Sequence, residues 1–66
     1  GKLYSASVHL QTVGEGENTK NMWYSEIRDR NHEVIFTSPF CNDESQARYG
    51  VQLYCKLNGL KMENMF

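Results

Sequence analysis

The sequence has little of what marks disulfide-rich domains, membrane proteins and nucleic-acid binders. It holds two cysteines and one proline, and its seven Lys/Arg and eight Asp/Glu leave a formal net charge of −1. Two cysteines are too few for a disulfide framework, and a nearly neutral chain has little non-specific attraction for nucleic acid or anionic lipid. No apolar run approaches the roughly 20 residues that span a bilayer. We therefore expect a soluble, cytoplasmic protein with no membrane partner.

The sequence also lacks the patterns of an enzyme. A chain of 66 residues makes one domain, and a domain of this size buries only about 60% of the surface of its unfolded chain, so a deep active site is not expected. His9 and His32 have no second histidine three or four residues away, and no serine lies in a nucleophile-elbow motif. We predict no catalytic residues, metal site, cofactor or small-molecule substrate.

Three strands are predicted in the first part of the chain. Apolar and polar residues alternate from residue 3 to residue 13, which is the period of a half-buried strand. The glycine-rich, charged segment 14–20 is predicted to be a flexible turn. A second strand is predicted at 22–28, with Trp23 and Ile27 on the core face.

The third strand is predicted at 34–38, and Pro39 ends it. A short turn joins it to the second strand as a hairpin. His32 stands where the tightest turns prefer glycine, so a slightly longer or bulged turn is the alternative.

A helix is predicted from Glu44 to Asn58. Asp43 is the N-cap candidate, and Gln46 lies at the spacing of a capping box. Gly59 is a helix-ending residue that favours a Schellman cap. Steps of about 100° per residue predict one buried arc. That arc contains Ala47, Gly50, Val51, Leu53, Tyr54, Cys55 and Leu57.

The two cysteines are not expected to pair. Along a continuous helix Cys55 lies on the order of 17 Å from Cys41, whereas a disulfide needs Cα atoms within about 7 Å. We predict that Cys55 is a buried apolar residue and that Cys41 lies at the approach to the helix. Gly50 on the buried arc predicts a close approach of the helix to the sheet.

The order strand, strand, strand, helix predicts an α+β fold. One amphipathic helix covering one face of a three-stranded antiparallel sheet is the simplest way to bury both apolar surfaces. We expect a two-layer β-β-β-α domain over residues 1–60, followed by a short C-terminal tail at 61–66. Met62, Met65 and Phe66 give this tail enough apolar surface to dock.

The segment "NHEVIFTSPFCNDESQARYGV" resembles the YegP-like family of small bacterial domains of unknown function. With the preceding strand included, the resemblance extends from Trp23 to Val51. The sequence departs from the family pattern at His32, which replaces a turn glycine, and at Pro39. The resemblance implies the same β-β-β-α fold and pairing as tandem copies or dimers, and it implies no activity. The positions that match are Trp23, Ile27, Asn31, Ile35, Thr37, Ser38, Phe40, Ala47, Gly50 and Val51.

With no chemistry indicated, the surface is the expected site of function. We predict a protein–protein interaction module that forms a homodimer or binds one protein partner, in a bacterium or one of its phages. Tyrosine and arginine are enriched at interface hot spots. The candidate interaction surface consists of Tyr24, Arg28, Arg30, Tyr49, Met62, Met65 and Phe66.

The alternative is a DNA-binding domain similar to the arm-binding domains of integrases, which place an exposed sheet face on DNA. Such a face needs positive charge, which Arg28 and Arg30 would supply here. Glu26 in the middle of that face and the neutral total charge disfavour a nucleic-acid partner.

Overall fold

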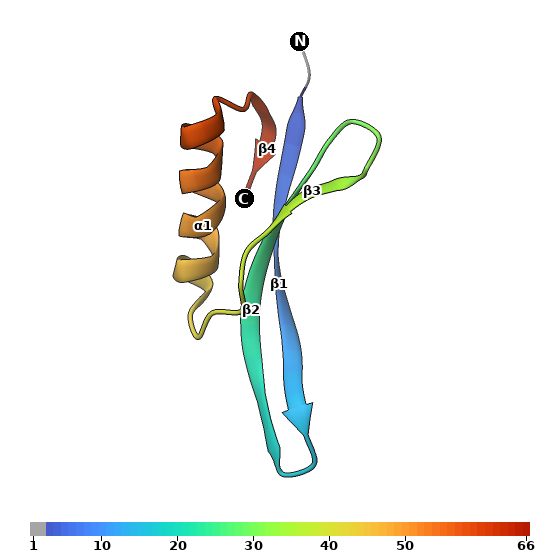
Figure 1. Ribbon diagram of the computed structural model, residues 1–66, viewed down its shortest axis with the longest axis vertical. Helices are drawn as coiled ribbons and strands as arrows, with labels where there is room; N and C mark the ends of the chain where they lie inside the picture. The colour runs from blue at the N-terminus through green and yellow to red at the C-terminus, as the bar shows by residue number, and fades with distance from the viewer. Residues whose placement is uncertain (1–2) are drawn as a thin grey trace.

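Two long strands form the frame of the fold, which the computed structural model describes for residues 3–66 (Figure 1). β1 (Tyr4–Glu15) and β2 (Asn18–Arg28) pair antiparallel, and only two residues separate them. The prediction of a flexible turn over 14–20 is therefore wrong for most of that segment. An exposed two-stranded ribbon is held by main-chain pairing and needs no apolar face, so its polar composition looked like that of a loop.

β3 (Val34–Thr37) pairs antiparallel with β2. Of the two turns considered from the sequence, the structure has the longer one between β2 and β3. The Asp29 amide donates to the Glu33 carbonyl at 3.0 Å. His32 has a φ of 65°, the left-handed conformation in which the tightest turns place glycine.

The segment predicted as a tail supplies a fourth strand. β4 (Met62–Met65) lies parallel to β1, and the sheet order is β3-β2-β1-β4. The predicted sheet of three antiparallel strands is thus right for β1 to β3 and incomplete, because the sheet is mixed and has four strands. Only Met62 of β4 packs against the core, so the strand shows no apolar alternation that would reveal it in the sequence.

The helix has the predicted bounds. α1 (Glu44–Asn58) begins where the Asp43 amide donates to the Gln46 side chain at 3.4 Å. It ends at Gly59, whose φ of 62° is left-handed, and the Leu60 amide donates back to the last turn at 3.1 Å. This is the predicted Schellman geometry.

The core lies between α1 and the two central strands, and it is small. Its buried apolar members are Ala6, Ile27, Ala47, Val51 and Cys55. The predicted arc is too wide on one flank, because Leu53 is 41% exposed and Leu57 is 75% exposed. That flank overhangs β3, which has four residues and is the edge of the sheet, so no further strand lies beneath it to cover these leucines.

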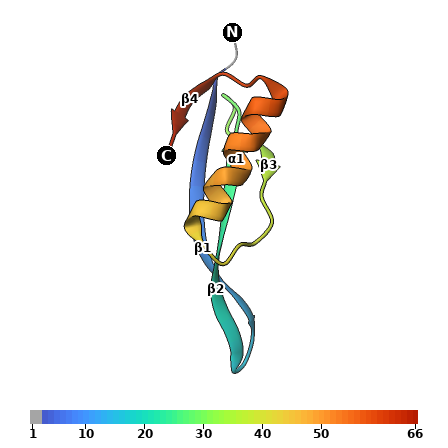
Figure 2. The same cartoon turned by 90° about the vertical axis from the view of Figure 1, so that its left-hand side faces the viewer.

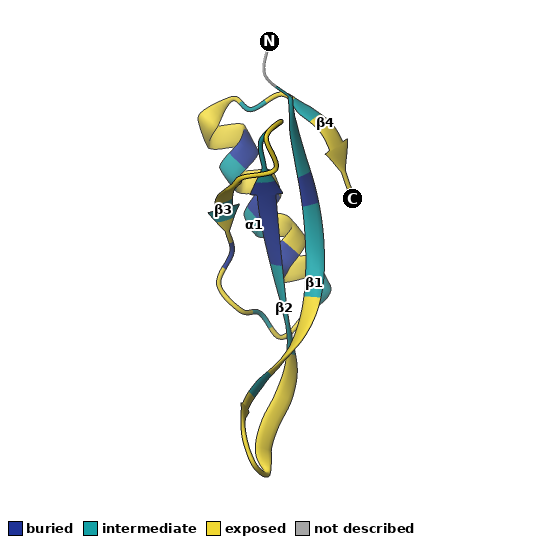
Figure 3. Cartoon of the chain, turned by 90° about the vertical axis from the view of Figure 1, so that its right-hand side faces the viewer, coloured by how far each residue is buried: buried dark blue, intermediate teal, exposed yellow. Residues whose placement is uncertain are grey.

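The molecule is elongated, since the far ends of β1 and β2 project beyond the helix as a two-stranded arm (Figures 1 and 3). The radius of gyration is 13.0 Å, against about 10.8 Å for a compact chain of this length. The accessible surface is 4809 Å², against about 4300 Å² for a folded monomer of this mass. No helix among residues 3–66 is long and apolar enough to cross a membrane.

Candidate functional site

Helix α1 covers one face of the sheet, and the opposite face is open (Figures 1 and 3). On this open face Tyr24 of β2 lies directly opposite His9 of β1, and their rings stack with centroids 5.1 Å apart. Phe40 meets Tyr24 edge to face at 5.6 Å. The three rings form one continuous cluster on the open face.

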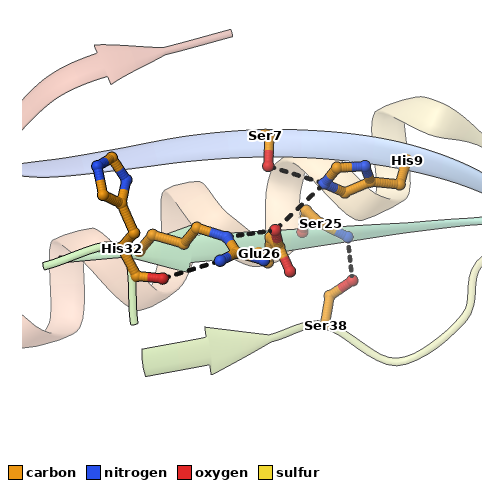
Figure 4. Close-up of polar contacts among 7 residues, drawn as sticks. Ser7, His9, Ser25, Glu26, His32 and Ser38 are labelled. Carbon is orange, nitrogen blue, oxygen red and sulfur yellow. Dashed lines mark hydrogen bonds and ion pairs between the residues drawn. The ribbon is translucent and has the colours of Figure 1, made fainter. Parts of the chain in front are cut away.

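A carboxylate lies beside this cluster. The Glu26 side chain is only 10% exposed, and its carboxylate accepts a hydrogen bond from Arg28 Nε at 2.8 Å and lies 3.4 Å from His9 Nε2 (Figure 4). Arg28 also donates to the main-chain carbonyl of His32 at 2.8 Å. A buried carboxylate needs such partners, so the charge of Arg28 is engaged within the face.

Ser7, His9 and Glu26 are the residue types of a catalytic triad, but their arrangement differs from one. Ser7 Oγ lies 2.8 Å from His9 Nε2, which is the same nitrogen that Glu26 approaches (Figure 4). A triad requires the nucleophile and the carboxylate on opposite ring nitrogens. This group therefore has no relay geometry, and among residues 3–66 no three His, Cys, Asp or Glu side chains are placed to hold a metal ion.

A second surface lies where the free edge of β3 meets the adjacent flank of α1 (Figure 2). We call it the β3 side. Its members are large, apolar or aromatic, and exposed: Val34, Ile35, Tyr49, Leu53 and Leu57. The three helical members recur every four residues, so they form one stripe along α1.

Contacts of the helix show which flank carries this stripe. The ring of Tyr54 stacks on Phe36 of β3 with centroids 4.4 Å apart. Leu53 and Leu57 lie on the Tyr54 side of the helix by their spacing, whereas Cys55 turns to the other side and meets β4. Tyr49, at the outer end of the stripe, faces away from the sheet. The leucine stripe therefore runs along the β3 edge and not along the β4 edge.

The predicted interaction residues are not gathered at one place. Tyr24 and Arg28 lie on the open face, Arg30 is exposed in the turn between β2 and β3, and Tyr49 belongs to the β3 side. The remaining three, Met62, Met65 and Phe66, lie on or just after β4.

Within the β4 group, Met62 packs against the core and is the least available to a partner. Phe66 lies beneath the Arg48 guanidinium, with 5.4 Å between that group and the ring centroid. Sequence reasoning missed Leu53 and Leu57 as surface residues, although their four-residue spacing from Tyr49 was a signal that could have found them.

Both cysteines are free, as expected. Cys55 is buried and its thiol donates to Met62 Sδ at 3.4 Å; burial raises the pKa of this thiol above its ordinary value. Cys41 is half-buried and donates to the Pro39 carbonyl at 3.3 Å. The two thiols lie at different places in the fold and form no shared site.

Comparison of the chain with protein-family models, with curated proteins and with solved structures found no match. The likeness to YegP-like domains therefore stays a prediction from the sequence.

Proposed function

We propose that this protein is a small interaction module that associates with a second copy of itself and acts without a cofactor. One observation carries the proposal: nine large apolar or aromatic side chains are exposed on so small a domain. Isolated exposed apolar residues are ordinary, but several of these are grouped. The exposed large hydrophobic residues are Leu10, Val34, Ile35, Phe40, Tyr49, Leu53, Leu57, Met65 and Phe66.

The small core supports the same proposal. Among the fully buried side chains of residues 3–66, only Ile27 and Val51 are large and apolar. A domain this small gains little stability from its own core, and association is a common way to add buried surface. The free thiols are consistent with the reducing, cytoplasmic setting that we propose.

The open face supports a protein partner more than duplex DNA. The Arg28 guanidinium is bound to Glu26 and to a main-chain carbonyl, which leaves it little freedom to bind a phosphate. Glu26 also places a negative charge where DNA phosphates would approach. DNA binding through this face, the alternative proposed from the sequence, would have to rely on Arg30 in the turn.

Light scattering across a dilution series from millimolar to submicromolar protein tests the proposal. We expect the mass to rise from that of one chain to that of two as concentration increases, with little dependence on salt. A monomer at every concentration would overturn the proposal. A gel shift with duplex DNA that weakens steeply with salt and is lost in Arg30→Ala would favour the alternative instead.

A further inference from the structure

We infer that the second copy binds at the β3 side, with the two β3 strands pairing antiparallel across a two-fold axis. The two four-stranded sheets then join into one continuous sheet, and both α1 helices lie on the same face of it. The inference rests on the proposed self-association and specifies its interface.

The free edge of β3 can accept another strand. β3 has no charged residue and no proline between Val34 and Thr37. Of the devices with which edge strands resist pairing, it has a short length, a register shift opposite Ile27 and Arg28, and Pro39 beyond its end. β4, the other edge strand, carries Glu63. The β3 edge is therefore the better template.

The main-chain amide and carbonyl groups of β3 are also oriented suitably for pairing with an added strand. The Ser38 amide donates to the Ser25 carbonyl of β2 at 2.8 Å. Because successive residues of a strand point their main-chain groups to opposite sides, the amide and carbonyl of Thr37 point away from β2. These groups are available to an added strand.

The helix flank supplies the apolar part of the same interface. β3 lies beside α1 (Figure 2). A two-fold axis through the β3 edge, perpendicular to the sheet, would therefore bring the two exposed leucine pairs, Leu53 and Leu57 of each copy, toward each other. With α1 over β2 and strands about 4.8 Å apart, the two helix axes would lie roughly 14 Å apart. Helices in contact lie about 8–10 Å apart, so large side chains are needed to fill the gap, and Leu53 and Leu57 are of that kind.

A second copy fits this surface better than an unrelated partner. An antiparallel strand edge is complementary to itself across a two-fold axis. None of the five β3-side residues is charged, and the net charge of −1 gives little repulsion between copies.

Three variants at exposed positions test the interface. Leu57→Glu places a charge in the helix stripe, and Ile35→Lys places one on the β3 edge. Leu10→Glu is the control, because Leu10 is 52% exposed but lies on β1 away from the β3 side. All three positions are exposed, so circular dichroism is expected to show the same fold in each variant.

We expect Leu57→Glu and Ile35→Lys to raise the dissociation constant of the dimer about tenfold or more, and Leu10→Glu to leave it unchanged. We also expect the Thr37 amide to become protected from hydrogen exchange as protein concentration rises. A wild-type dimer that Leu57→Glu and Ile35→Lys leave intact would overturn the interface and leave the proposed function standing. A wild-type monomer at every concentration would overturn both.

Discussion

The hydroxyl of Ser25 donates a hydrogen bond to the main-chain carbonyl of Ala47 at 2.5 Å, across the buried contact between β2 and α1. The Ser25 amide in turn donates to Ser38 Oγ at 2.8 Å. Ser25 is fully buried, so one small polar residue connects the helix, the central strand and the segment after β3. The position of the helix on the sheet depends on this residue as well as on apolar packing.

Ser25→Ala is expected to lower the free energy of unfolding by about 1 kcal/mol, since it removes a buried hydrogen bond. Thr12→Ala is the matched control, because the Thr12 hydroxyl donates to Asn21 in an exposed part of the arm. We expect that control to stay within about 0.5 kcal/mol of the wild type. Urea unfolding at a fixed protein concentration measures both values, and equal losses would contradict the role given to Ser25.

Gly50 is predicted to tolerate alanine but not leucine. A Cβ at this position would lie 3.4 Å from the Cβ of Ser38, which is close contact without overlap. Gly50→Ala should therefore keep or raise stability by up to about 1 kcal/mol, through helix propensity. Gly50→Leu should lower it by about 1–3 kcal/mol, because its extra carbons must displace neighbours.

Cys41→Ser is the comparison for both Gly50 variants, since Cys41 lies outside the helix and is half-buried. Thermal or urea unfolding should place it within about 0.5 kcal/mol of the wild type. If Gly50→Leu were tolerated as well as Cys41→Ser, the close packing of α1 on the sheet would be wrong.

The arm offers a test with two glycines that differ in one respect. Gly14 and Gly16 both have positive φ, at 108° and 59°, but a Cβ on Gly14 would lie 2.1 Å from the Asn18 carbonyl oxygen, and a Cβ on Gly16 would meet nothing within 4 Å. Gly14→Ala should therefore speed hydrogen exchange of the arm amides by about tenfold or more, and Gly16→Ala by clearly less. Equal effects of the two variants would contradict the close pairing of the arm.

Stability is expected to fall at alkaline pH through Cys55. Burial raises the pKa of this thiol in the folded protein, whereas its pKa in the unfolded chain is about 8.5. Above that value the unfolded chain releases a proton that the folded protein retains, so the free energy of unfolding decreases as pH rises. The contribution of Cys55 to stability is complete below the pKa of the unfolded chain, and it is lost as the pH rises through the pKa of the folded protein.

Unfolding free energies measured between neutral pH and the onset of tyrosine and lysine ionisation check this expectation. The downward slope should flatten in Cys55→Ala and persist in Cys41→Ser. Alkylation followed by mass spectrometry should also modify Cys41 before Cys55 in the folded protein. A slope unchanged by Cys55→Ala would assign the pH dependence to another group.

Local signals in the sequence were sufficient for α1 and for the core side of β2. The Asp43 and Gly59 positions define both ends of the helix, and Trp23 and Ile27 identify the inner face of the strand, because capping and alternation are properties of neighbouring residues. Partners distant in sequence decided the rest. β4 exists because β1 offers an edge to it, and Leu57 is exposed because the sheet ends at β3. A helical wheel carries no information on the width of the sheet.

For the candidate surfaces, the sequence indicated which residue types could form an interface, but not which of them are exposed or what they contact. Tyr49 was recognised from its chemistry, and the four-residue spacing groups it with Leu53 and Leu57, but the exposure of the two leucines depends on which flank of the helix faces β3. Arg28 was placed on the exposed sheet face correctly, yet its engagement by Glu26 required the geometry of both side chains.

The parallel pairing of β1 with β4 has a consequence for the order in which the chain folds. It joins segments separated by on the order of 60 residues, for example Tyr4 and Met62. The β1–β2 hairpin and the helix involve short loops, whose closure costs less entropy and is faster. We expect β4 to dock last, so that for part of each folding event the outer edge of β1 is open to any extended chain nearby.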